Sequence, residues 1–216
     1  MRWPAAASIA RKLASESWSP PRPTPTLPDP YLSKQSNELL AQTLLDRYSS
    51  FKAGWPSRDV TVQSLQRKAS QPLTDNPYEN ANIRLATELL RRPGLKDALD
   101  RNAGTGALDG RITKDSIRNF IRSDNPKKLT DDKQLAQEVL NSFNALKGGY
   151  FSNTIKLDDL IERGKKQPTG NSYVDYLTQL SNAVTARSDL TSSLDNRIPW
   201  FRDGEISRQD LYALLR

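Results

Sequence analysis

The stretch from Leu108 to Ile117 reads "LDGRITKDSI", and the stretch from Arg202 to Leu211 reads "RDGEISRQDL". Each has an Asp-Gly pair, an isoleucine two residues after the glycine, then Thr or Ser, and an apolar residue that ends the stretch. Glycine tolerates the left-handed backbone of a tight turn. Thr or Ser directly after the isoleucine is a good N-cap for a helix. Each stretch therefore predicts a turn, one extended residue and the start of a helix.

Two further stretches follow the same pattern, "SRDVTVQSL" ending at Leu65 and "FSNTIKLDDL" ending at Leu160. Alignment on the β-branched residue places in register Val60, Ile112, Ile155 and Ile206. Five residues later the aligned apolar residues are Leu65, Ile117, Leu160 and Leu211. Two residues earlier stand Arg58, Gly110, Asn153 and Gly204, the last three of which suit a left-handed backbone. The expected caps are Thr61, Thr113 and Ser207, and Lys156 breaks the pattern.

A segment of helical period precedes each stretch, with Ser36 and Thr130 as predicted caps of the first and third segments. The apolar positions at helical spacing are Leu40, Leu44, Tyr48 and Phe51; Ile83, Ala86 and Leu90, then Leu95 and Leu99; Leu135, Val139, Phe143 and Leu146; and Tyr173, Leu177, Leu180 and Val184, then Leu190 and Leu194.

Helix, loop, one β-branched residue and helix, repeated four times, is the architecture of EF-hand proteins. We expect an all-α fold of four degenerate EF-hand-like helix-loop-helix repeats in two paired lobes, residues 36–122 and residues 131–216. The β-branched residues should pair across each lobe, Val60 with Ile112 and Ile155 with Ile206.

Residues 1–35 differ from the rest of the chain, because seven of its fourteen prolines lie there. Dense proline opposes helix and strand, which predicts a disordered Pro/Ser-rich tail in front of the repeats. Its Ala/Ser-rich, basic opening resembles a mitochondrial presequence and equally the N-terminus of a type III secreted protein. Composition does not separate these two readings, and the tail is a candidate secretion signal.

The composition excludes several classes of function. The 216 residues include no cysteine and no histidine, which removes disulfides, thiolate and imidazole metal sites, and the Ser-His-Asp triad. The net charge is +7, but Lys and Arg are scattered among nearly as many acids, so we expect no nucleic-acid partner. No apolar run is long enough for a transmembrane helix.

Calcium binding needs six to eight oxygen ligands, supplied mainly by loop positions 1, 3, 5, 7, 9 and 12. With each β-branched residue at position 8, the candidate ligands are Asp109, Asp203 and Asp210. A longer loop would add Asp100 or Asn102 to Asp109, or Asp195 to Asp203. Aromatic residues stand at position 3 of three loops and are expected to fill the ion's space: Trp55, Tyr150 and Phe201. We therefore predict no metal or other cofactor, with calcium as the alternative.

The segments "LATELLRRPGLKDALDRNAGTGALDGRITKDSIRNFI" and "DKQLAQEVLNSFNAL" resemble the N-terminal repeats of the NolX/HrpF/HrpK family, which are type III secretion translocon or helper proteins of plant-associated bacteria. The resemblance covers about residues 36–160, and Leu190–Leu215 fits as a further copy. Members of that family are longer and carry hydrophobic C-terminal segments, which this sequence does not show. Pore formation therefore does not carry over, whereas a secreted, virulence-associated module that binds proteins does.

The leading hypothesis is a non-enzymatic effector or translocon-associated protein, secreted by a bacterial type III system or otherwise cytoplasmic. It would bind a protein of the host or of the secretion apparatus, with exposed aromatics such as Trp200 as candidate contacts. A calcium sensor or buffer is the first alternative. A carboxylate- or lysine-based enzyme in the cleft between the lobes is the second.

Overall fold

The computed structural model describes residues 27–55, 58–149, 151–195 and 203–216. The described chain is mostly helical, with two small antiparallel sheets, as the periodicity predicts. Residues 27–122, the N-terminal half, form in order η1 (Leu32–Lys34), α2 (Asn37–Asp46), η2 (Tyr48–Phe51), β1 (Val60–Thr61), α3 (Val62–Ala69), α4 (Pro77–Arg91), α5 (Leu95–Asp100), β2 (Arg111–Ile112) and α6 (Lys114–Arg122).

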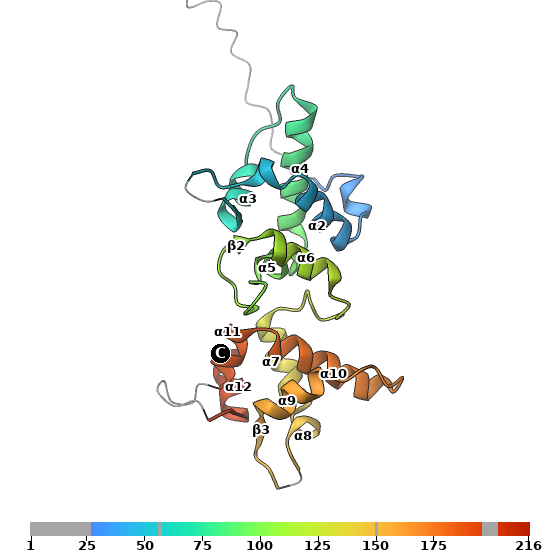
Figure 1. The fold of residues 1–216 in the computed structure, drawn as a ribbon, viewed down its shortest axis with the longest axis vertical. Coiled ribbons are helices and arrows are strands. Elements are labelled where there is room, and N and C mark those ends of the chain that lie inside the picture. The colour runs from blue at the N-terminus through green and yellow to red at the C-terminus, as the bar shows by residue number, and fades with distance from the viewer. Residues whose placement is uncertain (1–26, 56–57, 150, 196–202) are drawn as a thin grey trace, which may run out of the picture.

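Residues 131–216, the C-terminal half, follow a link of residues 123–130. Their elements are α7 (Asp132–Asn141), α8 (Phe143–Leu146), β3 (Thr154–Lys156), α9 (Leu157–Gly164), α10 (Ser172–Thr185), α11 (Ser188–Leu194), β4 (Glu205–Ser207) and α12 (Arg208–Leu215). The two halves stack end to end along the longest axis of the molecule (Figure 1). In each half the order helix, strand, helix occurs twice.

The predicted pairing of β-branched residues is confirmed. Strand β1 pairs with β2 in antiparallel register, Val60 opposite Ile112, and β3 pairs with β4 with Ile155 opposite Ile206. All four of these side chains are fully buried. Each short sheet therefore ties two consecutive helix-strand-helix units into one half.

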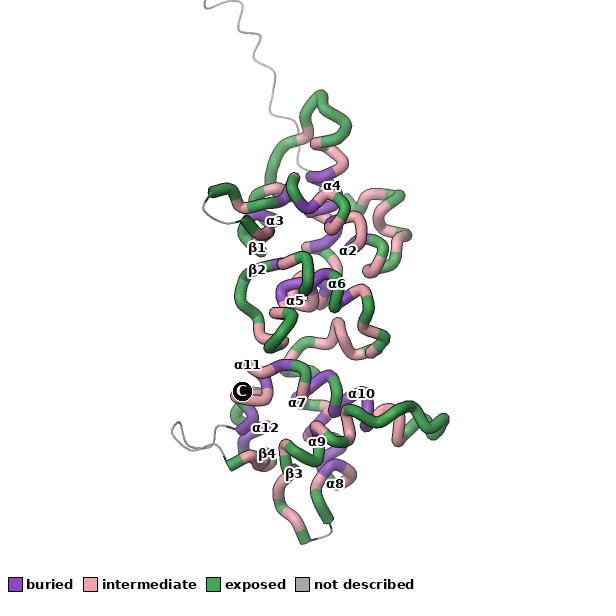
Figure 2. Tube along the Cα trace, viewed as in Figure 1, coloured by how far each residue is buried: buried purple, intermediate pink, exposed green. Residues whose placement is uncertain are grey.

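Each half has its own cluster of buried apolar side chains. Figure 2 shows the buried segments on the inward sides of the helices in both halves. The positions predicted at helical spacing are buried, with two exceptions: Leu90 is half-buried and Tyr173 is exposed. Tyr173 lies in the first turn of α10, where its ring stacks on Tyr176 and does not enter the core.

Most predicted caps are confirmed. The side chains of Ser36, Thr61, Thr113 and Ser207 each accept a backbone N–H at the start of a helix, and Lys156 makes no such bond. The predicted Thr130 cap is wrong by one residue. Asp131 caps α7 because its carboxylate accepts the N–H of Gln134, whose side chain in turn bonds the N–H of Asp131.

Two other details differ from expectation. Gly110 and Gly204 have left-handed backbones, as expected, but Asn153 does not. Among the described residues only glycines have a positive φ. The predicted disordered range 1–35 also extends too far, since Leu32–Lys34 form η1. The guanidinium of Arg92 holds this segment by donating to the carbonyl oxygens of Leu32, Ser33 and Gln35 at 2.8–3.1 Å.

Candidate functional site

The three candidate calcium ligands serve as turn and cap residues. One carboxylate oxygen of Asp109 accepts the N–H of Arg111 at 2.9 Å, and the other accepts the side-chain amide of Asn102 at 3.0 Å. Asp203 accepts the N–H of Glu205 at 3.0 Å. Asp210 accepts both the N–H and the hydroxyl of Ser207, which completes the capping box of α12. These carboxylates are therefore engaged with their own loops.

Two other aspartates, Asp100 and Asp195, hold the left-handed glycines of their loops. Asp195 is 7% exposed and accepts the N–H of Gly204 at 2.9 Å. Asp100 is 6% exposed and accepts the N–H of Gly110. In both loops the aspartate at the end of the helix before the loop therefore binds the glycine of the turn that follows.

Asp100 differs from Asp195 in one respect that matters chemically. Its Oδ1 atom is buried and has no hydrogen-bond partner. Burial, and then the negative charge of Asp109, raise the pKa of Asp100 to about 6. Burial disfavours a charged carboxylate, and a second carboxylate nearby disfavours it further. The loop from Asp100 to Gly110 therefore holds an unsatisfied acid.

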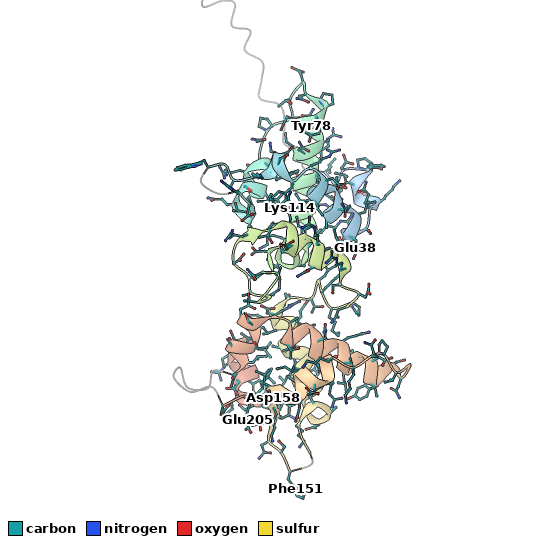
Figure 3. All side chains as sticks on the ribbon, in the orientation of Figure 1. Glu38, Tyr78, Lys114, Phe151, Asp158 and Glu205 are labelled. Carbon is teal, nitrogen blue, oxygen red and sulfur yellow. The ribbon has the colours of Figure 1, made fainter. Side chains whose placement is uncertain are left out.

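The expected aromatic filling of the loops is wrong where it can be assessed. Trp55 is 97% exposed, so its ring does not fill the loop before β1. Tyr150, Trp200 and Phe201 lie outside the described residues. Phe151, next to Tyr150, lies exposed at the tip of the loop before β3, at the far end of the C-terminal half (Figure 3). Within the described ranges, no group of three or more acidic, histidine or cysteine side chains is placed to hold a metal ion.

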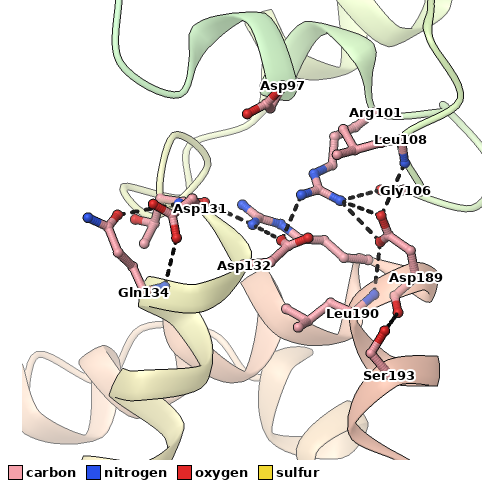
Figure 4. Close-up of polar contacts among 12 residues, drawn as sticks. Asp97, Arg101, Gly106, Leu108, Asp131, Asp132, Gln134, Asp189, Leu190 and Ser193 are labelled. Atoms are coloured by element: carbon pink, nitrogen blue, oxygen red, sulfur yellow. Dashed lines mark hydrogen bonds and ion pairs between the residues drawn. The ribbon is translucent and has the colours of Figure 1, made fainter. Parts of the chain in front are cut away.

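The junction between the halves is a polar network built on two arginines (Figure 4). Arg101, at the end of α5, donates to Asp132 at 2.7 Å and to Asp189 at 3.1 Å. Arg187, just before α11, donates to the same oxygen of Asp132 at 2.6 Å and to the carbonyl of Thr130 at 2.8 Å. One carboxylate therefore binds guanidinium groups from both halves.

Arg187 is deeply enclosed in this network, at 4% exposure. Burial, and then the positive charge of Arg101, lower the pKa of Arg187, while Asp132 opposes that shift. A buried guanidinium needs its partners, because removing them leaves an uncompensated charge. The junction is therefore held by charges that depend on one another.

The loop from Asp100 to Gly110 also contacts the C-terminal half through its backbone. The carbonyl of Thr105 accepts the N–H of Ser188 at 3.0 Å, and the N–H of Leu108 donates to Asp189 at 3.2 Å. Gly106 has φ +70°, and a Cβ added there would lie 1.7 Å from the carbonyl oxygen of Ala186. Only glycine permits this close approach. A cavity of about 350 Å³ adjoins these contacts, between α5, α6 and α10.

A second hollow lies at the outer end of the N-terminal half, between η1, α2 and α4. This groove has a volume of about 620 Å³, and its apolar lining is Tyr31, Leu32, Leu39, Pro77, Ala81 and Leu85. Leu39 is 50% exposed although it lies on a core helix. Its charged lining residues are Arg47 and the ion pair of Arg84 with Asp29 at 3.2 Å.

Sequence reasoning found the loops but missed the junction and the groove. Arg101 and Arg187 lie 86 residues apart in a chain rich in scattered arginine, so no spacing marks them as partners. The sequence offered one indication of the junction: Gly106 lies close to a second glycine in its loop, which suggests a close approach of the backbone to another segment. Leu39 falls outside the apolar stripe that defines the core face of α2.

Comparison with protein-family models, with curated proteins and with solved structures finds no match. No described helix is long and apolar enough to cross a membrane.

Proposed function

We propose that the chain is a non-enzymatic, type III secreted effector or translocon-associated protein that binds another protein through four degenerate EF-hand-like units in two lobes. The unit pattern is supported by the paired β-branched residues, the two left-handed glycines and the helix caps that follow the strands. The resemblance of residues 36–160 to the N-terminal repeats of the NolX/HrpF/HrpK family supplies the secretion context.

The observation that carries the binding function is the groove between η1, α2 and α4. Leu39 and Tyr31 are large apolar side chains left exposed beside a hollow of about 620 Å³. An amphipathic helix buries its apolar face in a groove of this kind. Arg84 is paired there with Asp29 at 3.2 Å, and Arg47 is the basic group that favours a partner helix with acidic residues flanking its apolar face.

The non-enzymatic reading is supported by the position of the perturbed acid. Asp100 has a raised pKa, as catalytic acids often do. Yet its carboxylate is enclosed within its own loop, at 6% exposure, where a substrate does not reach it.

Export is tested with a reporter fused to the chain in a bacterium with an intact or an inactivated type III apparatus. We expect export in the intact strain only, and its loss when residues 2–26 are deleted. This deletion leaves Asp29 and the segment held by Arg92 in place, which deletion of all 35 residues would not. Equal export from both strains, or export unaffected by the deletion, would contradict the secretion role.

Binding is tested by placing a photoreactive residue at position 39 and, as a matched control, at position 212. Both side chains are about half exposed, but Tyr212 lies on α12, far from the groove. We expect one cross-linked protein from position 39 alone. Calorimetry with that purified partner should then show binding that Leu39→Asp weakens at least about tenfold and Tyr212→Asp does not. Equal cross-linking at both positions would contradict the groove as the binding site.

A further inference from the structure

We propose that the groove between η1, α2 and α4 receives a tyrosine side chain of the partner helix, in the place that Tyr176 takes in the C-terminal half of this chain. The inference rests on the proposed function for the existence of the partner helix, and it adds the side chain that this helix inserts. It starts from a comparison of the two halves, which repeat one frame.

Positions 95 residues apart are equivalent in the two halves, as Val60 and Ile155 are in the paired strands. The equivalence includes the segments that precede the first helix of each half. Arg92 donates to backbone carbonyls of one segment, and Arg187, 95 positions later, donates to the corresponding carbonyls of the other. These acceptors are Leu32 and Gln35 in the first half, and Lys127 and Thr130 in the second. The groove beside η1 therefore has a counterpart place in the C-terminal half.

In the C-terminal half this place is taken by a tyrosine. The ring of Tyr176 packs against the core, and its hydroxyl donates to Glu138 on α7 at 3.1 Å. The ammonium of Lys127, from the segment before α7, lies 4.5 Å from the centroid of the same ring. Tyr173, one turn earlier in α10, stacks on it as well. The shared frame therefore accommodates a tyrosine ring between the first helix, the long helix and the segment that precedes them.

The N-terminal half has a small residue where that tyrosine stands. Ala81 is equivalent to Tyr176, and it lines the groove of about 620 Å³. Three other lining residues are less polar than their counterparts: Leu32 stands for Lys127, Leu39 for Gln134 and Thr43 for Glu138. The hollow therefore corresponds to the space that a tyrosine occupies in the other half, and its walls are more apolar.

Polar groups of the groove fit a tyrosine and an acid beside it. Thr43 stands where Glu138 accepts the hydroxyl of Tyr176. The Thr43 hydroxyl donates to a carbonyl of its own helix at 2.8 Å, so its oxygen can still accept a hydrogen bond. Arg47 donates to the side chain of Asn82 at 3.3 Å and has no acidic partner among the described residues. A carboxylate close to the partner's tyrosine would complement this charge.

The test uses para-cresol, the side-chain analogue of tyrosine, because this probe needs no knowledge of the partner. The full chain is titrated with para-cresol and followed by NMR of the backbone amides. We expect saturable shifts at Leu32, Leu39 and Ala81, with a dissociation constant on the order of 10⁻³–10⁻² M for a ligand of this size. Thr43→Val should weaken binding about threefold, since it removes the acceptor for the hydroxyl.

Two reciprocal variants exchange this feature between the halves. Ala81→Tyr supplies the ring from within the chain and should weaken binding of para-cresol at the groove at least about tenfold. Tyr176→Ala removes the ring from the C-terminal half and should create a second binding place there, seen as shifts at Lys127 and Gln134. Circular dichroism checks that both variants are folded. Ala81 is only half-buried, so Ala81→Tyr keeps the test valid if Tyr176→Ala unfolds.

The protein that cross-links to position 39 supplies the second readout. Replacement of one of its tyrosines by alanine should weaken its binding to the native chain at least about tenfold, and Ala81→Tyr should do the same. If none of its tyrosines matters, the groove still binds a helix and the tyrosine is wrong. If no protein cross-links, the proposed function fails, and the para-cresol titration still decides whether the groove takes the ring.

The proposal is overturned if para-cresol gives no saturable shifts at the groove, or if the native chain and Ala81→Tyr bind it equally. Two other occupants of the groove have their own signatures. Tighter binding of para-cresol after deletion of residues 2–26 would show that Trp3 or Trp18 of this chain covers the groove. A dimer in sedimentation that Ala81→Tyr abolishes would assign the groove to a second copy. Either result would overturn a tyrosine from a different protein.

Discussion

The two halves share a frame of paired strands and capped helices, but they use the last loop position differently. In the N-terminal half this position is Ser64 or Ser116, whose hydroxyls donate to the carbonyls of Phe51 and Leu99 at 2.7 and 2.8 Å. In the C-terminal half it is Asp159 or Asp210, which cannot donate when ionised. A serine thus ties the incoming helix to the outgoing helix in one half only. The frame therefore persists without metal ligands, because side-chain hydrogen bonds can take over the closing of a loop.

Asp100 and Asp195, which hold equivalent glycine turns in the two halves, show a second difference. Both aspartates accept the N–H of the glycine in their turn. Asp100 also keeps one buried carboxylate oxygen without a hydrogen-bond partner. The Asp100 loop is also the one pressed against the other half, through Gly106 and Ala186. The acid with the unpartnered oxygen and the junction therefore belong to the same segment.

The largest expected effect breaks the connection between the halves. Asp132→Leu removes the carboxylate that binds both Arg101 and the buried Arg187. We expect the free energy of unfolding to fall by about 3–5 kcal/mol, because the buried guanidinium of Arg187 is left without this carboxylate. Scanning calorimetry should show a lower midpoint and separate transitions for the two halves. Arg84→Met, whose partner Asp29 it meets at the surface, should cost less than about 1 kcal/mol. Similar losses from both variants would contradict a special role for the junction.

Two left-handed glycines of one loop provide the next test. Gly106 and Gly110 have φ +70° and +75°, so alanine strains the backbone about equally at both. Around Gly110 there is nothing within 4 Å of an added Cβ, whereas Gly106 is packed against Ala186.

Gly110→Ala should therefore cost about 1 kcal/mol, and Gly106→Ala at least about 2 kcal/mol more, because the loop must withdraw from α10. Chemical denaturation measures both. If both variants lost the same free energy of unfolding, the contact of Gly106 with Ala186 would not contribute to stability.

The buried acids give the third comparison. The pKa of Asp100 is about 6 in the folded chain, against an ordinary value of 3.8, so the folded state holds the proton more tightly. The stability that this protonation contributes is complete below pH 4 and is lost as pH rises through 6.

Asp100→Asn should thus raise the free energy of unfolding by about 2 kcal/mol at pH 7.5 and leave it unchanged at pH 3.5. Asp195→Asn should change it by less than half as much at pH 7.5, because the buried oxygen without a partner and the nearby charge of Asp109 belong to Asp100. Urea titrations of both variants at the two pH values decide this, and a loss of stability in Asp100→Asn at pH 7.5 would contradict it.

Much of the frame could be predicted from the sequence because it is local. A glycine turn, a β-branched residue and a hydroxyl cap act within a few residues of one another, so Gly110, Ile112 and Thr113 predict their own conformations. The pairing of Val60 with Ile112 followed from repetition of this pattern. These features need no knowledge of distant parts of the chain.

What was missed depends on contacts between distant segments. Asp132 and Asp189 look like surface acids in the sequence, and only the stacking of the halves makes them partners of Arg101. Trp55 is likewise exposed, although an aromatic residue at its loop position suggested a filled centre. Asp100 was considered as a ligand, but its unpartnered oxygen depends on how α5 meets the turn at Gly110.

The smallest expected effect returns to the one repeat that breaks the cap pattern. Lys156 stands where Thr61, Thr113 and Ser207 cap their helices, and α9 begins without a side-chain cap. Lys156→Thr would place a hydroxyl there, with Asp159 in position to complete a capping box. A new cap stabilises by about 1 kcal/mol, while the cross-strand partner Glu205 loses a lysine neighbour worth a few tenths of that.

The net gain should be about 0.5 kcal/mol, and Thr113→Ala, the matched removal, should cost about 1 kcal/mol. Denaturation midpoints measure both. If Lys156→Thr destabilises the chain while Thr113→Ala behaves as expected, the pairing of Lys156 with Glu205 matters more to β3 and β4 than the cap does to α9. The missing cap would then be the consequence of the place of Lys156 opposite Glu205 in the sheet.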